Sequence, residues 1–391
     1  MNGQRKIVIE NSMNDEIVGI LKKYLHRMDV SYHDNKLSTS IYHRIVDSLK
    51  DSKKIKHDYT LSDMKTPCNL TPSTFLPLEV IESINHTLHY QYEVGFEHKN
   101  IDFRIRICFD GTIPVEEYIS YIKWVICLCL QNITNEKKET MTIDIYLTSL
   151  KKYVPGDFQH GIQPIHINSG YSSLNGNMHI CIYRKEEWLK VLIHECFHAF
   201  DMDFHEEQIH FPNIFKKTFF IHSSFLAFES FVEFWARVLN CAIFTYKLKP
   251  FIQVKEFCEL FSLNMNLERI HSLLQASKML NLFQLKYQDI ISKERGAICK
   301  TIYKEETNAF CYYIITAILM NFFDKTLQWF EVHNNDLFYF NKSERQVIIF
   351  CHYIKQVAKN EQLIAILDEL NVCKIQKENF LKMCLFEIKL K

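Results

Sequence analysis

The spacing of apolar residues predicts helices near the N-terminus, followed by a β-hairpin. Over 17–28, 40–50 and 76–88 the apolar residues recur three and four positions apart, as they do in amphipathic helices. The pattern then changes to an alternation of apolar and polar residues over 89–111, with a polar turn at 98–100. An alternation interrupted by such a turn predicts two antiparallel strands.

The pattern after the hairpin predicts further strands and then an almost entirely helical C-terminal half. Helical spacing returns over 115–133, and three short stretches favour strands: 141–149, 165–171 and 178–184. From Glu186 onward the spacing is helical nearly to the end of the chain. This order of elements predicts an α+β fold, in which a small mixed sheet packs against a mostly helical C-terminal lobe.

The same change of pattern suggests how the chain is organised. We predict an N-terminal helical region over 1–90, a catalytic core of sheet and two helices over 91–240, and a helical lobe over 241–391. The strands give way to helices just before Glu186. A site near this transition would lie on the floor of a cleft between the sheet and the helices.

Composition narrows the classes of function. The 391 residues are 47% hydrophobic, which is typical of a globular protein with a large core. Lys+Arg and Asp+Glu both number 46, so the overall charge gives no reason to expect nucleic-acid binding. The longest apolar runs are too short to cross a bilayer, so we predict no membrane partner. The 13 cysteines follow no regular spacing and no secretory signal is visible, which indicates reduced thiols in the cytoplasm.

One helical stretch, 184–204, combines residues that can bind and activate a metal ion. His194 and His198 lie four positions apart, so a helix brings both imidazoles to one face, close enough to share one cation. Glu195 lies beside that face, where its carboxylate can accept a proton from a metal-bound water. The pattern therefore indicates a zinc hydrolase. Two histidines that pack beneath aromatic side chains would give the same pattern.

A second predicted helix, over 222–240, carries two acids in an aromatic environment. Glu229 and Glu233 lie four positions apart, so they share one face of this helix. An unpaired carboxylate is unfavourable in an apolar interior, and a metal ion would explain its presence there. The alternative is a polar stripe that faces solvent. The predicted strand at 178–184 directly precedes the first helix, in the place that resembles the position where zincin-type enzymes have the edge strand that pairs with a peptide substrate.

Together these features resemble the gluzincin peptidases, which carry H-E-x-x-H on one helix and a zinc-binding glutamate on a following helix. Glu229 matches this ligand, with thirty residues between it and His198. Glu233 matches the acid that orients a zinc-bound histidine in thermolysin-like members, where it is an aspartate. The resemblance covers 165–240 and implies Zn²⁺ bound by His194, His198 and Glu229. The same stretches are similar to uncharacterised metallopeptidase-like proteins of large DNA viruses.

The resemblance also implies a mechanism. Glu195 would act as the general base toward a zinc-bound water and then pass the proton to the leaving amine. In gluzincins a tyrosine or histidine from the C-terminal lobe usually stabilises the transition state. Tyr312 and Tyr313 are the first candidates here, followed by His352 and Tyr353, and ordinary core packing is the alternative for each tyrosine.

Other residues near the motif compete for the place of the third ligand. Metzincins continue the motif with a glycine and a histidine, but the chain has Asp201 and Phe204 at these positions, so that arrangement is excluded. We rank Glu229 first, Glu233 second and His205 third. The remaining candidates are Asp201, Asp203, His210 and His222.

Three further features bear on the surroundings of the site. Cys196 lies within the motif but faces away from the two histidines, so we expect it in the core. Backbone groups over 168–171 are candidates for lining the cleft. Arg184 or Arg237 can hold the terminal carboxylate of a substrate, if the protein is a carboxypeptidase.

These observations predict a zinc metallopeptidase that hydrolyses a peptide bond in a protein or peptide substrate. The alternative is a structural or host-interaction protein, viral in origin, with a degenerate or merely stabilising zinc site. A closed structural site has four protein ligands, whereas a catalytic site keeps one position open. In either case we expect an intracellular protein, in the cytoplasm of its own or a host cell or in a virion.

Overall fold

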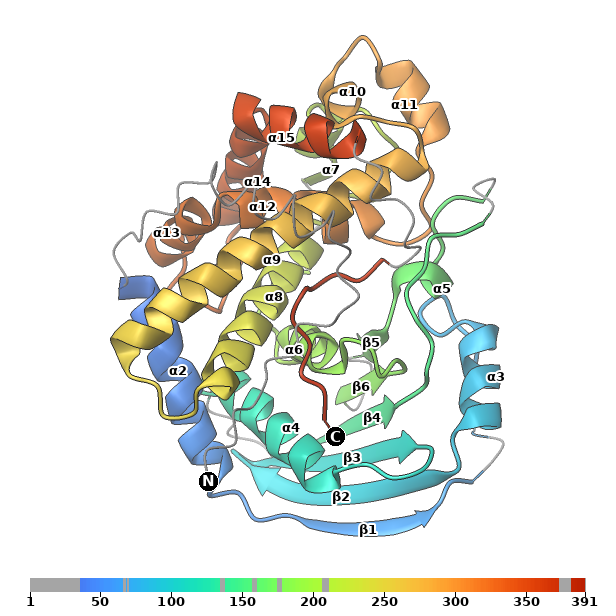
Figure 1. The fold of residues 1–391 in the computed structure, drawn as a ribbon, viewed down its shortest axis with the longest axis vertical. Coiled ribbons are helices and arrows are strands. Elements are labelled where there is room, and N and C mark those ends of the chain that lie inside the picture. Colours follow the sequence, from blue (N-terminus) through green and yellow to red (C-terminus); the bar gives the residue numbers. More distant parts are fainter. Residues whose placement is uncertain are drawn as a thin grey trace, which may run out of the picture.

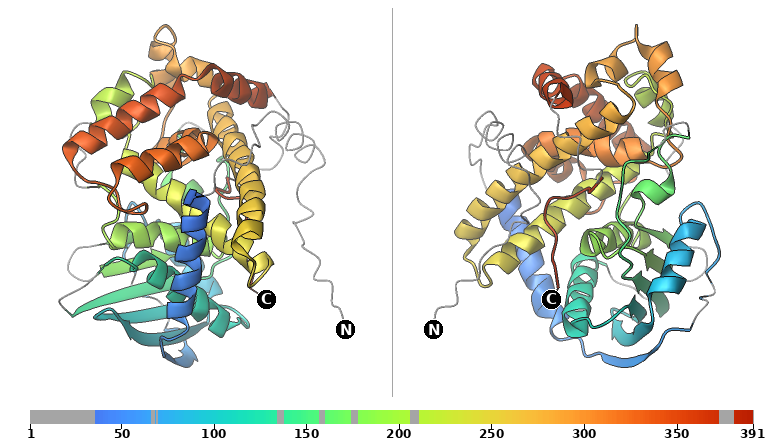
Figure 2. Two further views of the ribbon diagram at one scale, coloured as in Figure 1. Left: turned by 90° about the vertical axis from the view of Figure 1, so that its left-hand side faces the viewer. Right: turned by 45° about the vertical axis from the view of Figure 1, so that its right-hand side comes forward.

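The structure is a computed structural model with a mixed α+β fold (Figure 1). It describes residues 36–65, 68, 70–133, 138–156, 160–173, 178–205, 211–372 and 381–390. The sheet forms one end of the molecule and most of the long helices form the other (Figure 2). The predicted α+β class, with a small mixed sheet and a mostly helical remainder, is therefore confirmed. The helix predicted over 17–28 and the candidate ligand His210 lie outside the described residues.

The six strands form a mixed sheet in the order β1-β2-β3-β4-β6-β5. Strands β3, β4 and β6 run parallel, and the remaining pairs are antiparallel. The predicted hairpin is present, because Lys99 and Asn100, both with positive φ, turn β2 into β3. The strands are β1 (Asp58–Asp63), β2 (Tyr90–His98), β3 (Ile101–Phe109), β4 (Glu139–Tyr146), β5 (Gly170–Ser173) and β6 (Met178–Ile182).

Three predictions about the strands are wrong in detail. Strand β1 lies in the region expected to hold only helices and loops, and all six of its residues are exposed, so no apolar alternation marks it. The strand predicted over 165–171 begins only at Gly170, after the short helix α5 (Pro164–Ile167). Strand β6 lies between β4 and β5, so β5, and not β6, is the edge strand beside the predicted motif.

Two hydrophobic cores sandwich the sheet. Alternate residues of β3 and β4, among them Ile105 and Ile143, face the main core with the helices α2 (Lys36–Ser52) and α4 (Val115–Cys129). On the opposite face Cys108 and Tyr146 join a smaller core under α3 (Leu78–Thr87). Every cysteine in the described part of the chain is free, and all but Cys68 are buried.

The predicted motif helix, α6 (Trp188–Ala199), lies at the junction of sheet and helices. It packs against β5, β6 and α4 on the sheet side and against α8 (Ala227–Leu248) on the other. Apolar residues spaced three and four apart, such as Leu189, Ile193 and Cys196, bury one side of α6 in the main core. This packing places the remaining face of α6 against α8.

The helical half is built around two long helices, α8 and α9 (Val254–Leu282), which lie side by side (Figure 1). Among the described helices, none has the length and apolar character needed to cross a membrane. Residues 381–390 run without regular structure across α6 and α8. The other helices are α7 (Phe211–Lys216), α10 (Tyr287–Ile291), α11 (Gly296–Ile302), the π-helix η1 (Phe310–Ile315), α12 (Thr316–Asn321), α13 (Phe323–His333), α14 (Glu344–Ala358) and α15 (Glu361–Val372).

Candidate metal centre

Helices α6 and α8 face each other through two complementary rows of polar side chains. In each row the residues are four positions apart, so they stand above one another on one helix face. Lys190, at the start of the α6 row, pairs with Glu233 in the middle of the α8 row. The two histidines of the α6 row lie against Glu229. The rows are Lys190, His194 and His198 on α6, and Glu229, Glu233 and Arg237 on α8.

Three atoms from these rows form a nearly equilateral triangle. The Nε2 atoms of His194 and His198 are 3.2 Å apart. The Oε2 atom of Glu229 lies 3.3 Å from each of them. Three ligand atoms bound to one ion at roughly 2.0–2.1 Å with tetrahedral angles lie about 3.3–3.4 Å apart. His194, His198 and Glu229 therefore form a group that can hold a metal ion.

The carboxylate of Glu229 gives this interpretation a second support. Its Oε1 atom accepts a hydrogen bond from Asn308 Nδ2 at 3.1 Å. Its Oε2 atom is buried and has no hydrogen-bond partner among the described residues. A buried carboxylate oxygen without a partner is unfavourable. A cation at the centre of the triangle would supply the missing interaction.

Each histidine is held by a carboxylate on the side away from the triangle. His194 Nδ1 donates to Glu233 Oε2 at 3.1 Å, and His198 Nδ1 donates to Asp203 Oδ2. A proton on Nδ1 leaves the lone pair on Nε2, which is the atom aimed at the triangle. Glu233 therefore contacts His194 on the side away from the triangle, as the resemblance to thermolysin-like peptidases implies. Asp203 has the same role for the other histidine, a role not foreseen from the sequence.

Glu233 is also the centre of a buried ion-pair network. Lys190 Nζ lies 2.8 Å and 3.0 Å from its two oxygens, and Arg237 Nε lies 2.9 Å from Oε1. Burial alone would raise the pKa of Glu233, but Lys190 and Arg237 lower it well below its usual range. The carboxylate is therefore fully paired and ionised, and it can keep the His194 imidazole oriented.

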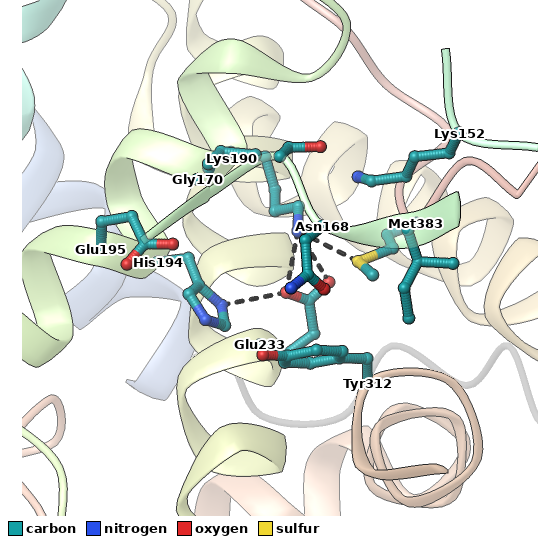
Figure 3. Close-up of a pocket in the computed structure, with 12 residues that line it drawn as sticks. Lys152, Asn168, Gly170, Lys190, His194, Glu195, Glu233, Tyr312 and Met383 are labelled. Carbon is teal, nitrogen blue, oxygen red and sulfur yellow. Dashed lines mark hydrogen bonds and ion pairs between the residues drawn. The ribbon is translucent and has the colours of Figure 1, made fainter. Parts of the chain in front are cut away.

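Glu195 points into the space beside the triangle, close to the edge strand (Figure 3). Burial raises the pKa of its carboxyl group, and the neighbouring histidines only partly oppose that shift. The backbone of β5 comes very near to α6, because a Cβ on Gly170 would lie 2.9 Å from Val191 Cγ1 and 3.4 Å from Glu195 Oε1. Glycine is thus the residue that lets β5 approach α6 this closely.

The two candidate tyrosines have different positions, although they are adjacent in the π-helix η1. Tyr312 lines the pocket, and its ring meets the ring of His194 edge-on at a centroid distance of 5.8 Å. Tyr313 is completely buried, and its hydroxyl donates to Leu381 O at 2.6 Å. The structure therefore brings Tyr312, and not Tyr313, to the candidate centre. Adjacent residues of a helix point in different directions, so only one of these two tyrosines can face the pocket.

The other candidates for oxyanion donor lie elsewhere. His352 is exposed on α14. The hydroxyl of Tyr353 lies 2.8 Å from Thr326 Oγ1, and its ring stacks on Trp329. Neither residue is among those that line the pocket.

The competing metal ligands are accounted for in the same way. Asp203 binds His198 and also His205, whose Nδ1 lies 2.7 Å from Asp203 Oδ1. Asp201 is exposed and pairs with Lys342, and His222 is exposed too. The thiol of Cys196 is buried in the main core, as expected. Among the described residues, no His, Cys, Asp or Glu joins the three-residue group as a fourth ligand.

A pocket opens beside His194 and Glu195 (Figure 3). The loop before β5 contributes the predicted cleft residues Asn168, Ser169 and Gly170. The same loop carries the Asn168 carbonyl that fixes Arg184. The full lining is Lys152, Ile167, Asn168, Ser169, Gly170, Lys190, Val191, His194, Glu195, Glu233, Tyr312 and Met383.

The two arginines considered for substrate binding are already engaged. Arg184 donates to the carbonyl oxygens of Asn168, Lys151 and Ile165. Arg237 donates to Glu233, to Ser272 Oγ and to the carbonyl of Tyr312. Both side chains serve the structure around the pocket. The basic groups that do line it, Lys152 and Lys190, were not foreseen, although Lys190 lies one helical turn before His194.

Comparisons of the chain with protein-family models, with curated proteins and with solved structures find no match. The likeness to gluzincins therefore rests on the spacing of the motif residues. The function has to be argued from the geometry of the candidate centre.

Proposed function

We propose that the protein is a zinc-dependent peptidase. The observation that carries the proposal is the triangle of two imidazole nitrogens and one carboxylate oxygen, with spacings of 3.2–3.3 Å that suit tetrahedral zinc. Two histidines and one glutamate are the protein ligands of one class of catalytic zinc site. A structural zinc site would need four protein ligands, and the described residues offer three. The open fourth position favours catalysis.

Glu195 is the residue that handles the proton in this proposal. A bound zinc ion supplies Lewis-acid polarisation of a peptide carbonyl and lowers the pKa of a water molecule. Glu195 accepts a proton from the attacking water as the C–O bond forms, and it then returns the proton to the departing amine as the C–N bond breaks. Its carboxyl pKa is raised by burial toward the range in which a general base both accepts and releases protons.

Two further elements fit a peptide substrate. Strand β5 is the last strand of the sheet, so the described residues leave one of its edges without a partner strand. An extended peptide can bind along such an edge through main-chain hydrogen bonds. The hydroxyl of Tyr312, across the pocket from β5, is the group we assign to stabilise the negative charge that develops on the carbonyl oxygen (Figure 3).

The substitution Glu195→Gln tests the proposal. Activity is assayed by mass spectrometry on a broad mixture of peptides, and zinc is quantified on the same preparations. The variant should retain zinc and lose about 100- to 10,000-fold in hydrolysis, the usual contribution of a general base. The matched control is Glu268→Gln, another buried glutamate, which should retain both. Full activity of Glu195→Gln would refute the assignment of the base.

A further inference from the structure

The pocket beside the candidate centre has a basic wall. Figure 3 places His194 and Glu195 on one side of it, and Lys152 and Met383 on the other. Lys152 and Lys190 are only 1% and 3% exposed, so their ammonium groups are almost completely removed from solvent. Buried lysines are rare unless they are paired, so their partners show what each one can still bind.

Lys152 retains unused hydrogen-bonding capacity. It belongs to the loop between β4 and α5, and its amine points into the pocket toward Asn168 (Figure 3). An ammonium group has three N–H donors. Among the described residues the only acceptor is Glu187 Oε2. Two donors therefore remain for a group that enters the pocket.

Two neighbours add further donors without partners. The hydroxyl of Ser169 is buried and makes no hydrogen bond within the described chain. Asn168 accepts a hydrogen bond from Thr307 through Oδ1, while its Nδ2 finds no acceptor among the described residues. Ser169 and Asn168 both line the pocket. Such a set of amine, hydroxyl and amide donors matches the acceptor oxygens of a carboxylate.

The charges on the basic wall of the pocket also favour a carboxylate ligand. Glu233 is the single carboxylate paired with both Lys190 and Arg237, so this trio keeps one positive charge. Glu268 also interacts with Arg237, but burial raises its carboxyl pKa to about 7 and leaves it partly protonated near neutral pH. Glu187 compensates Lys152. On this wall Lys152, Lys190 and Arg237 therefore face two ionised carboxylates, Glu187 and Glu233. Glu195 lies on the opposite side of the pocket, so an anion is favoured beside Lys152 and away from Glu195.

We propose that this pocket binds a carboxylate of the substrate close to the scissile bond. The proposal rests on the peptidase function and names its substrate class. The carboxylate has two possible sources: an acidic side chain next to the scissile bond, or the carboxyl group that ends the substrate chain. Both would accept hydrogen bonds from Lys152 and Ser169 while the neighbouring peptide group lies at His194 and Glu195.

Matched peptides distinguish the two sources. A peptide that the zinc-loaded protein cleaves is resynthesised with Glu or Gln at each position that flanks the scissile bond, and with a free or amidated C-terminus. Charge-assisted hydrogen bonds to the pocket should raise kcat/KM about 10- to 100-fold for the carboxylate form. A preference for Glu over Gln identifies a side chain. A preference for the free terminus identifies a carboxypeptidase.

Variants link that preference to the pocket. Lys152→Met combined with Glu187→Gln removes the amine without leaving a buried carboxylate unpaired, and it should abolish the preference for the carboxylate peptide. Ser169→Ala removes a hydroxyl that has no internal partner, so it tests the pocket without a folding penalty, and it should reduce the preference up to about 10-fold. Lys123→Met is the control, because this buried lysine on α4 binds Ile55 O and His57, outside the pocket.

A binding measurement separates the pocket from catalysis. Saturation-transfer NMR on the zinc-loaded Glu195→Gln protein compares acetyl-glutamate amide with acetyl-glutamine amide, and acetyl-alanine with acetyl-alanine amide. The carboxylate member should bind in one of the pairs and lose binding when Lys152→Met and Glu187→Gln are added. Binding that survives those changes would come from the metal ion alone and would overturn the proposal.

The outcomes for the pocket and for the enzyme are distinct. Cleavage without any preference for a carboxylate would refute the basic pocket and leave the peptidase function intact. If no peptide is cleaved, the peptidase function fails, and the NMR comparison still decides whether the pocket binds a carboxylate.

Discussion

Three glutamates of the helical half each bury one carboxyl oxygen that has no hydrogen-bond partner among the described residues: Glu229, Glu268 and Glu305. The three carboxyl groups differ in their pKa values. Burial raises the pKa of Glu268 and of Glu305 to about 7, so each can bind a proton near neutral pH. At Glu229, His198 and His194 outweigh burial and hold the pKa at about 2.

The difference lies in what surrounds the unpaired oxygen. Glu229 Oε2 has two imidazole Nε2 atoms at 3.3 Å, and each imidazole is held at its Nδ1 atom by a carboxylate of its own. Glu268 has Arg237 and backbone N–H groups nearby, and Glu305 accepts from Tyr303 and from a backbone N–H. A buried unpaired carboxylate is thus not by itself evidence of a metal centre. The two converging imidazoles are what distinguish Glu229.

The largest effect that this comparison predicts is the loss of metal in Glu229→Ala. Removing one of three ligands should weaken zinc binding by more than the roughly 10- to 100-fold typical of an outer partner. Elemental analysis after gel filtration should find about one zinc per chain in the wild type and almost none in the variant. Glu268→Gln is the control that should keep its zinc. Equal zinc content in Glu229→Ala would show that the triangle is not the binding site.

A smaller effect is expected for Asp203→Asn. An asparagine at this position can accept a hydrogen bond through only one oxygen, so His198 and His205 would compete for it. Zinc affinity should fall about 10- to 100-fold, as when the outer partner of a ligand is changed. Competition with a chromophoric chelator measures the dissociation constant. Asp201→Asn, on the same loop but exposed, should leave the affinity unchanged. An unaltered affinity in Asp203→Asn would mean that this carboxylate does not orient the ligand.

The smallest effect concerns stability and its dependence on pH. The folded-state pKa of Glu268, about 7, lies above the ordinary value of 4.5, so the folded state binds this proton more tightly than the unfolded state. Its contribution is fully present below pH 4.5 and is lost as the pH rises through 7. Glu268→Gln should therefore be more stable than the wild type at pH 8, by about 1–3 kcal/mol, and similar to it at pH 4.5.

Urea unfolding of the wild type and of Glu268→Gln at pH 4.5, 6 and 8 checks this prediction. A stability difference that does not change over this range would contradict it. That result would mean that Glu268 does not bind a proton in the folded state, and the contrast with Glu229 would fail.

The parts of the candidate centre that could be predicted from sequence are those set by helix geometry. His194 and His198 share a face because they are four residues apart, and the same holds for Glu229 and Glu233. Apolar residues around both pairs are spaced as in buried helices, so α6 and α8 could be predicted, with ends that differ from the observed ones by four to eight residues. These features are local, because each depends only on residues that are close together in the sequence.

The edge strand could not be predicted, because it depends on contacts between residues far apart in the sequence. Strand β1 has no buried residue, and β5 differs from β6 only in its place at the end of the sheet, which pairing between distant segments determines. Asp203 looked like a possible ligand, because spacing does not say whether a carboxylate reaches the metal side or the outer side of an imidazole. The sequence likewise does not show which of the adjacent residues Tyr312 and Tyr313 faces the pocket.

The sequence by itself determined that His194 and His198 share one helix face beside Glu195, and that a later helix carries Glu229 as a candidate ligand. Helical periodicity explains this, because residues four positions apart lie on the same face. The tertiary structure decided that Glu229 Oε2 meets both imidazoles, that Arg184 and Arg237 are engaged, and that a basic pocket containing Lys152 opens beside them. The packing of α6 against α8 and the approach of distant loops set these distances, and no local pattern records them.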